Sequence, residues 1–235
     1  SVLHFLKDPS TCKKVEESYV YIEDALLVVE NGKIKELGAY ADLKSDYSDF
    51  DIADYSGKLI LPGFVDTHIH FPQTEMIASH GAELLDWLET YTFPTEKKFK
   101  DKEYAKEVAE FFVRQLLQQG TTTALVFGSV HKESVDAFFE VAAQQNLRMI
   151  AGKVMMDRNA PEYLLDTAES SYKDSKELIE KWHGKERLQY AVTPRFAPTS
   201  SSEQLAMAKQ LLEEYPDVYL HTHLSENHGE IAWVK

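Results

Sequence analysis

The chain has 235 residues, of which 43% are hydrophobic and 27% charged, so it can bury the core of one large domain with a small satellite. Its formal net charge of -14 argues against nucleic acids and anionic membranes as partners, because phosphate contacts need clustered Lys and Arg side chains. Cys12 is the single cysteine, which excludes an internal disulfide and any metal site built on a cysteine cluster.

The first predicted unit is rich in β-structure. Tyr19–Ile22 and Ala25–Val29 are runs of β-branched and aromatic residues, and the sequence Glu30-Asn31-Gly32-Lys33 is a hairpin turn signal. A further strand is expected at the end of the segment Asp51–Leu61. We therefore predict a small N-terminal β-sandwich-like domain over residues 1–58.

After residue 58 the pattern changes to strands that alternate with helices, which is typical of a parallel sheet covered by helices. Two of the expected helices end at the stop signals Gly120 and Gly184. This alternation predicts an α/β fold, a (β/α)8 TIM-type barrel whose N-terminal portion, with about five βα units, is residues 59–235. The expected strands are Leu59–Thr67, Thr121–Phe127, Arg148–Met156, Leu188–Thr193 and Val218–His223, and the expected helices are Tyr104–Gln119, Glu133–Gln145, Tyr172–His183 and Ser201–Glu214.

A further helix is expected to begin in the last segment, Asn227–Lys235. A parallel barrel that ended there would expose an apolar strand edge. We therefore expect the sequence to be incomplete at its C-terminus.

The strongest chemical signal is the run Pro62-Gly63-Phe64-Val65-Asp66-Thr67-His68-Ile69-His70. Residues two apart in a strand point to the same side, so His68 and His70 are expected to face the mouth of the barrel, where barrel active sites lie. Neutral imidazoles suit Zn²⁺, and two on one strand begin a tetrahedral site. The alternative is a pair of buried, hydrogen-bonded histidines.

The second signal is His221-Thr222-His223-Leu224-Ser225-Glu226. His223 is the outer histidine and the expected metal ligand, whereas His221 is expected one layer deeper, behind the ligands or in the core. Glu226 follows the strand, where a carboxylate can move protons between an activated water and a ring nitrogen. The alternative for Glu226 is an acidic residue favoured by the dipole of a helix N-terminus.

These segments resemble the amidohydrolase superfamily, whose first barrel strand carries an H-x-H pair and whose fifth carries one metal-binding histidine. Five segments are similar to the guanine deaminase family within it, and the resemblance runs from about residue 20 to the end. These segments are Phe71-Pro72-Gln73, Leu84-Leu85-Asp86-Trp87-Leu88, Tyr91-Thr92-Phe93-Pro94-Thr95-Glu96, Thr193-Pro194-Arg195-Phe196-Ala197-Pro198 and His223-Leu224-Ser225-Glu226-Asn227.

The resemblance implies a ligand set and a proton carrier. His68, His70 and His223 would bind one zinc ion per subunit, with iron or another divalent metal as an alternative, and Glu226 would carry the proton. The family's further ligands, a histidine on the sixth strand and an aspartate on the eighth, are expected beyond Lys235.

The resemblance also implies that Gln73 and Arg195, with Phe196 beside it, hold a purine. A guanidinium suits the O6 acceptor of guanine, whereas adenine would present an amine and leave the guanidinium unpaired. Two structural alternatives stay open, namely a salt bridge of Arg195 at the barrel rim and an ordinary loop amide for Gln73.

The implied activity is zinc-dependent hydrolysis of guanine to xanthine and ammonia, in purine catabolism, by a homodimer. No apolar run reaches the length of a membrane span and Ser1–Lys7 has no signal-peptide pattern, so we expect a cytoplasmic protein. Two other hypotheses are an aminohydrolase of the same superfamily that acts on a triazine, another purine or a pyrimidine, and a non-catalytic barrel scaffold.

Five other residues are weaker candidates for the site. His131 and Asp157 lie at expected strand ends, where structural roles are favoured. Trp87, Tyr91 and Phe93 are expected either to form an aromatic lid over the substrate or to pack, for example at a subunit interface.

Overall fold

The computed structural model describes residues 1–81 and 84–235, and its internal contacts divide the chain into two units, Ser1–Gly63 and Phe64–Lys235. The division falls slightly after the boundary expected at residue 58, and the independence of the two units as domains stays a prediction. None of the described helices is both long and apolar enough to cross a membrane.

The first unit contains two antiparallel strand pairs. Strand β1 (Val2–Phe5) pairs with β2 (Tyr19–Ile22), and β3 (Ala25–Glu30) pairs with β4 (Lys33–Ala39), which leads into the short helix α1 (Tyr40–Leu43). Asn31 and Gly32 have φ angles of 53° and 73° at the hairpin turn, as the turn signal predicted. Two short 3₁₀ helices, η1 (Pro9–Thr11) and η2 (Val15–Ser18), separate β1 from β2.

The strand predicted after Lys58, Leu59–Thr67, begins later than expected, at Phe64. Residues 51–61 contain no strand, and Ile60 forms a single isolated bridge with Val2. The apolar residues that suggested a strand lie just before β5 (Phe64–His70), which begins after Pro62 and Gly63. Proline lacks the backbone N–H that a strand would need at that position.

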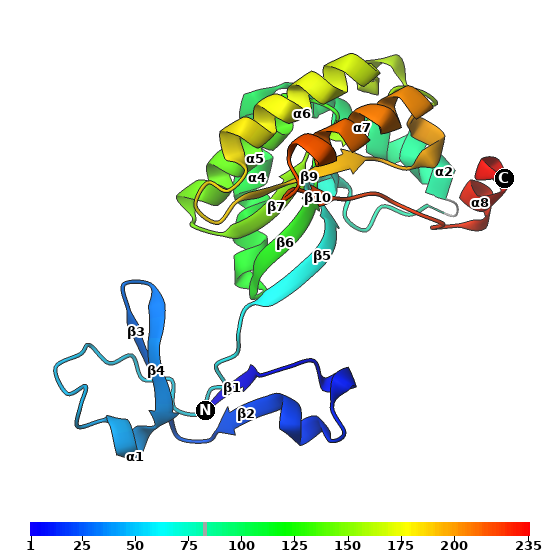
Figure 1. Cartoon of the computed structure of the whole chain (residues 1–235). Helices are drawn as coiled ribbons and strands as arrows, with labels where there is room; N and C mark the ends of the chain where they lie inside the picture. Colours follow the sequence, from blue (N-terminus) through cyan, green and yellow to red (C-terminus); the bar gives the residue numbers. More distant parts are fainter. Residues whose placement is uncertain (82–83) are drawn as a thin grey trace. The chain divides into compact units, whose positions relative to one another are not determined.

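The second unit is built on a parallel sheet whose strands lie side by side in chain order (Figure 1). Every described pairing in this sheet is parallel, and a helical segment connects each long strand to the next, as the alternating pattern predicted. The strands across the sheet are β5, β6 (Thr121–Phe127), β7 (Arg148–Gly152), β9 (Gln189–Pro194) and β10 (Tyr219–Leu220), with the short β8 (Val154–Met155) paired to β9.

Four helices cover one face of this sheet, and each packs against the next (Figure 1). Their bounds agree with the expected ones to within a few residues, and Gly120 and Gly184 take positive φ angles of 84° and 72° just after two of them. The helices are α4 (Lys102–Gln118), α5 (Lys132–Gln144), α6 (Ala168–Trp182) and α7 (Ser202–Glu214).

A series of short helical turns connects β5 to α4 and carries several residues of the site. It consists of η3 (Phe71–Met76), α2 (Leu84–Trp87), the π-helical turn η4 (Leu88–Thr92), α3 (Phe93–Glu96) and η5 (Lys97–Lys100). The remaining short elements are η6 (Glu162–Leu164), η7 (Ala197–Thr199) and α8 (His228–Val234).

The main core lies between the helices and the sheet. Phe138 of α5 is fully buried at its centre, with ring centroids 5.2 Å from Phe71, 6.2 Å from Phe112 and 6.0 Å from Phe139. This aromatic group connects η3, directly after the H-x-H strand, to α4 and α5. Packing in the core therefore supports the carboxyl end of β5.

Replacement of Phe138 by alanine should lower the free energy of unfolding by about 3–5 kcal/mol, because it removes a buried ring and leaves a cavity. The matched control is Phe111→Ala on α4, where the ring is 44% exposed and the expected loss is below about 1 kcal/mol. Denaturant unfolding of both variants checks the difference. Equal losses would show that Phe138 is not a central core residue.

Candidate functional site

The site forms where the two edge strands of the parallel sheet approach each other. Strands β5 and β10 lie at opposite ends of the strand order, yet His68 Nδ1 of β5 is 3.1 Å from the Nε2 of His221, which directly follows β10. A flat sheet would hold these side chains several strand spacings apart. The sheet therefore curves strongly at its carboxyl end, as barrel strands do.

Three imidazoles converge in the way the sequence predicted. Single nitrogen atoms of His68, His70 and His223 all lie within 4.8 Å of one another, and the Nε2 atoms of His70 and His223 are 3.0 Å apart. His68 and His70 come from alternate positions of β5, whereas His223 lies in the segment after β10. The geometry thus brings together the three predicted ligands.

Backbone and side-chain contacts set the orientation of these rings. The Nδ1 of His223 lies 2.9 Å from the carbonyl oxygen of Arg195, so Nδ1–H donates there and the lone pair of Nε2 stays free. The side-chain amide of Gln73 lies 3.3 Å from the Nδ1 of His70. Gln73 therefore contacts an imidazole of the cluster and is more than an isolated loop amide.

His221 occupies the deeper position that the sequence indicated. It is 6% exposed, its Nε2 faces His68, and its Nδ1 has no hydrogen-bond partner among the described residues. It stands behind His68, outside the group of three converging nitrogens. This placement favours a supporting position over a ligand.

Phe127, the last residue of β6, forms the apolar side of the histidine cluster. Its ring stacks on His70 with centroids 4.5 Å apart and lies 4.1 Å from His221 and 4.3 Å from His223. Loss of contact with water lowers the pKa of His70 far below its usual value, that of His221 to about 3 and that of His223 to about 4. These imidazoles are therefore neutral near pH 7, the form that binds metal ions.

Arg195 is buried directly beside this cluster. Its Nη1 donates to Glu96 Oε2 at 2.9 Å, and its guanidinium lies 5.8 Å from the centroid of the Phe93 ring. A salt bridge was one of the alternatives for Arg195, but the pair is buried and does not lie on an exposed rim. Phe196, the next residue, is only 5% exposed.

Glu226 lies in the segment between β10 and α8, and its side chain is exposed. Its backbone N–H and that of Ser225, which has a φ of 57°, donate to the two carboxylate oxygens of Glu230 at 2.7 and 3.0 Å. Asn227 is the N-cap of α8, so Glu226 precedes the helix and the acidic residue of its first turn is Glu230. The helix-dipole alternative therefore fits Glu230 better than Glu226.

Sequence reasoning missed two buried acids, Glu96 and Glu230. Each lies outside the strand ends where polar residues were sought, and acidic residues are normally exposed. The run Tyr91–Glu96 was noted for its resemblance, but nothing in it marked the glutamate as the ion-pair partner of Arg195.

Of the weaker candidates, Asp157 has a structural role, whereas no role is assigned to His131. Asp157 accepts hydrogen bonds from the backbone and the hydroxyl of Ser201, the N-cap of α7, which is a structural contact. His131 is the N-cap residue of α5 without a side-chain capping bond. Neither is in the group of three converging ligand atoms.

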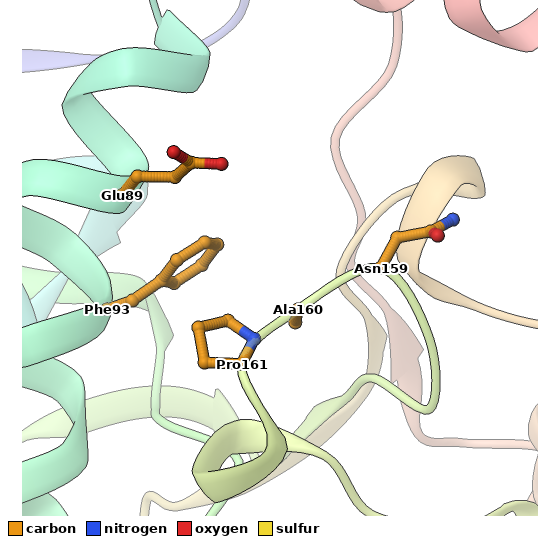
Figure 2. Close-up of a pocket in the computed structure, with 5 residues that line it drawn as sticks. All are labelled: Glu89, Phe93, Asn159, Ala160 and Pro161. Atoms are coloured by element: carbon orange, nitrogen blue, oxygen red, sulfur yellow. The ribbon is translucent and has the colours of Figure 1, made fainter.

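Phe93, whose ring contacts the guanidinium of Arg195, also lines a cavity. The cavity measures about 490 Å³ and, as Figure 2 shows, Glu89 and Phe93 form one wall while Asn159, Ala160 and Pro161 form the other. Phe93 is therefore shared by this cavity and the guanidinium of Arg195. Whether Trp87 and Tyr91 form a lid stays a prediction.

Loss of one converging imidazole should abolish tight binding of a divalent metal. We expect His70→Asn and His223→Asn to bind zinc at least about tenfold more weakly, because each removes one of three nitrogens that share a site. His183→Asn is the matched control, because His183 contacts Asp217 and Tyr190 away from the cluster. Metal content after dialysis against a weak chelator checks this, and unchanged content in both variants would contradict it.

The comparisons with known proteins agree with this geometry. The profile of the amidohydrolase family matches residues 59–235. The chain is 61% identical over 224 residues to the guanine deaminase of Escherichia coli (strain K12), which covers 95% of this chain and 51% of that protein. The chain thus spans about half the length of the curated relatives it matches.

Solved structures give the same result for the fold. The E. coli guanine deaminase structure superposes with a TM-score of 0.96 at 57% identity, over 100% of this chain and 54% of that one. The guanine deaminase of C. acetobutylicum with bound guanine in the active site superposes with a TM-score of 0.88 at 32% identity, over 100% of this chain and 54% of that one. These matches confirm the predicted α/β fold class, and the chain belongs to the amidohydrolase family.

Proposed function

We propose that the protein is a guanine deaminase that uses zinc to hydrolyse guanine to xanthine and ammonia. The observation that carries this proposal is the convergence of three imidazoles beside the buried guanidinium of Arg195. The 61% identity to the guanine deaminase of E. coli supports the choice of substrate. A cytoplasmic location and a homodimer stay predictions from the resemblance.

The histidines fit a zinc ion in number, chemistry and spacing. Two nitrogens that bind one tetrahedral zinc ion are about 3.3 Å apart, since each Zn–N distance is about 2.0–2.1 Å. The Nε2 atoms of His70 and His223 are 3.0 Å apart, and all three nitrogens lie within 4.8 Å. Imidazole also binds iron and other divalent ions, so zinc is the preferred member of this set.

When bound, zinc would lower the pKa of a water molecule and make hydroxide available near neutral pH. Glu226 would take one proton from the water as it attacks C2 of guanine, and would deliver it to the neighbouring ring nitrogen. The second proton, left on the new hydroxyl group at C2, would pass to the exocyclic nitrogen. The bond from C2 to that nitrogen would then break as C2=O forms, and ammonia and xanthine would leave. The carboxylate of Glu226 is exposed, and its backbone N–H donates to the carboxylate of Glu230.

Three residues would hold the ring. Arg195 would donate to O6 of guanine and stabilise the negative charge that builds up on the ring during attack. Phe196 would pack on the ring, and Gln73 would contact its edge from beside His70. Adenine carries an amine at the position of O6 and would leave the guanidinium without an acceptor.

Replacement of Glu226 by glutamine should abolish deamination while zinc stays bound, because the amide cannot accept and release a proton. The loss expected for a general acid–base residue is about 10²–10⁴-fold in kcat. Glu203→Gln, at an exposed position in the first turn of α7, is the control for loss of one carboxylate. Turnover near the wild-type value in Glu226→Gln would end the assignment.

A substrate panel separates this proposal from its two rivals. Ammonia release should be fastest by a clear margin with guanine, compared with adenine, cytosine and a triazine. A different best substrate would favour another aminohydrolase of the family. Release from none of them by zinc-loaded protein would favour a non-catalytic scaffold.

A further inference from the structure

The buried ion pair of Arg195 and Glu96 joins two segments that are far apart in sequence. Arg195 follows β9, whereas Glu96 is the last residue of α3, and their side chains are 4% and 1% exposed. The bond is made through Glu96 Oε2, and Glu96 Oε1 has no hydrogen-bond partner within the part of the chain that the structure describes. A charge this deeply buried needs an opposite charge close by, because its removal from water costs free energy.

Arg195 also lies next to the predicted metal ligands, because its backbone carbonyl oxygen is 2.9 Å from the Nδ1 of His223. Its charge helps to lower the pKa of both His70 and His223, though less than their burial does, so the guanidinium lies close to the predicted cation site. A divalent ion at the imidazoles would repel the guanidinium in an environment that screens charge poorly. Glu96 is the carboxylate that contacts this guanidinium.

The short helix α3 fixes the guanidinium in two ways. Glu96 Oε2 accepts a hydrogen bond from Nη1 at 2.9 Å, and the ring of Phe93, three residues earlier, lies 5.8 Å from the central carbon of the guanidinium. Residues three apart on a helix share a face, so one turn supplies both contacts. A guanidinium has five N–H donors, and the bond to Glu96 leaves others for a ligand.

We propose that Glu96 is the positioning residue for Arg195, and that the pair selects ring ligands that carry an oxygen at the carbon facing the guanidinium. The carboxylate of Glu96 fixes the direction of the remaining N–H donors of Arg195. It also reduces the electrostatic repulsion between Arg195 and the cation. This inference rests on the proposed function, because it assigns O6 of guanine to Arg195. It adds a second residue of α3, beside Phe93, to the surroundings of the guanidinium.

A purely structural role for Glu96 predicts something different. If the pair only connected α3 to the sheet, its loss would weaken the binding of every ligand to the same extent. If Glu96 acts through Arg195, its loss affects ligands with the ring oxygen and spares those without it. Guanine and 2-aminopurine differ in this oxygen and share the amine at C2.

The test compares Glu96→Gln, Glu96→Asp and the control Glu75→Gln in zinc-loaded protein. Glu75 forms the exposed salt bridge with Lys98 on the neighbouring η3 and η5 turns, so its replacement removes a carboxylate without contact to Arg195. We expect Glu96→Gln to raise the KM for guanine by about tenfold or more, because a hydrogen bond to a charged group is lost or misdirected. The inhibition constant of 2-aminopurine should stay within about threefold, as should both constants in Glu75→Gln.

Equal weakening of guanine and 2-aminopurine in Glu96→Gln, or an unchanged KM for guanine, would overturn the inference. If Glu96→Gln does not unfold cooperatively, the KM for guanine and the inhibition constant of 2-aminopurine are compared in Glu96→Asp instead. This variant keeps the negative charge but has a side chain shorter by one methylene group. Failure of the proposed function is a separate result, because wild-type protein and Glu75→Gln would then release no ammonia from guanine.

Discussion

The curvature of one parallel sheet is the constraint on which the site depends. His68 and His70 belong to one edge strand and His223 follows the other, and a strongly curved sheet brings their side-chain nitrogens within 4.8 Å of one another. The helices α4 to α7 and the aromatic core around Phe138 hold that curvature from one face. The chemistry of the site is therefore a consequence of the packing behind it.

The residues around the histidine cluster also control its charge and its contact with water. Phe127 and the surrounding core keep water from His70, His221 and His223, so the imidazoles stay neutral and keep their lone pairs available. The one buried cation beside them in the described residues, Arg195, is neutralised by Glu96. Glu230 then fixes the backbone that carries Glu226. Two buried acids thus support two residues to which the proposed reaction assigns direct roles.

The sequence was sufficient for the fold class and most element bounds, because strand periodicity and stop signals are local features. The grouping of His68, His70 and His223 was implied by the resemblance to the amidohydrolase superfamily, and the structure brings these three residues together. The sequence could not predict which residues pair across the sheet. The partner of Arg195 lies almost a hundred residues earlier in a series of short turns whose local pattern specifies no regular helix. The start of the strand Leu59–Thr67 was predicted too early for a related reason, since the apolar residues before Pro62 were judged without knowledge of their pairing partner. Correct prediction of the Arg195–Glu96 pair and of the strand near Pro62 would have required knowledge of long-range contacts.

The central claim is that one metal ion is shared by His68, His70 and His223, and a crystal structure of zinc-loaded protein with anomalous data on both sides of the zinc absorption edge tests it most directly. We predict one strong anomalous peak about 2.0–2.1 Å from a nitrogen of each of the three imidazoles. His221 should lie outside this ligand set, behind His68. Rings that turn away from one another, with no peak between them, would contradict the account.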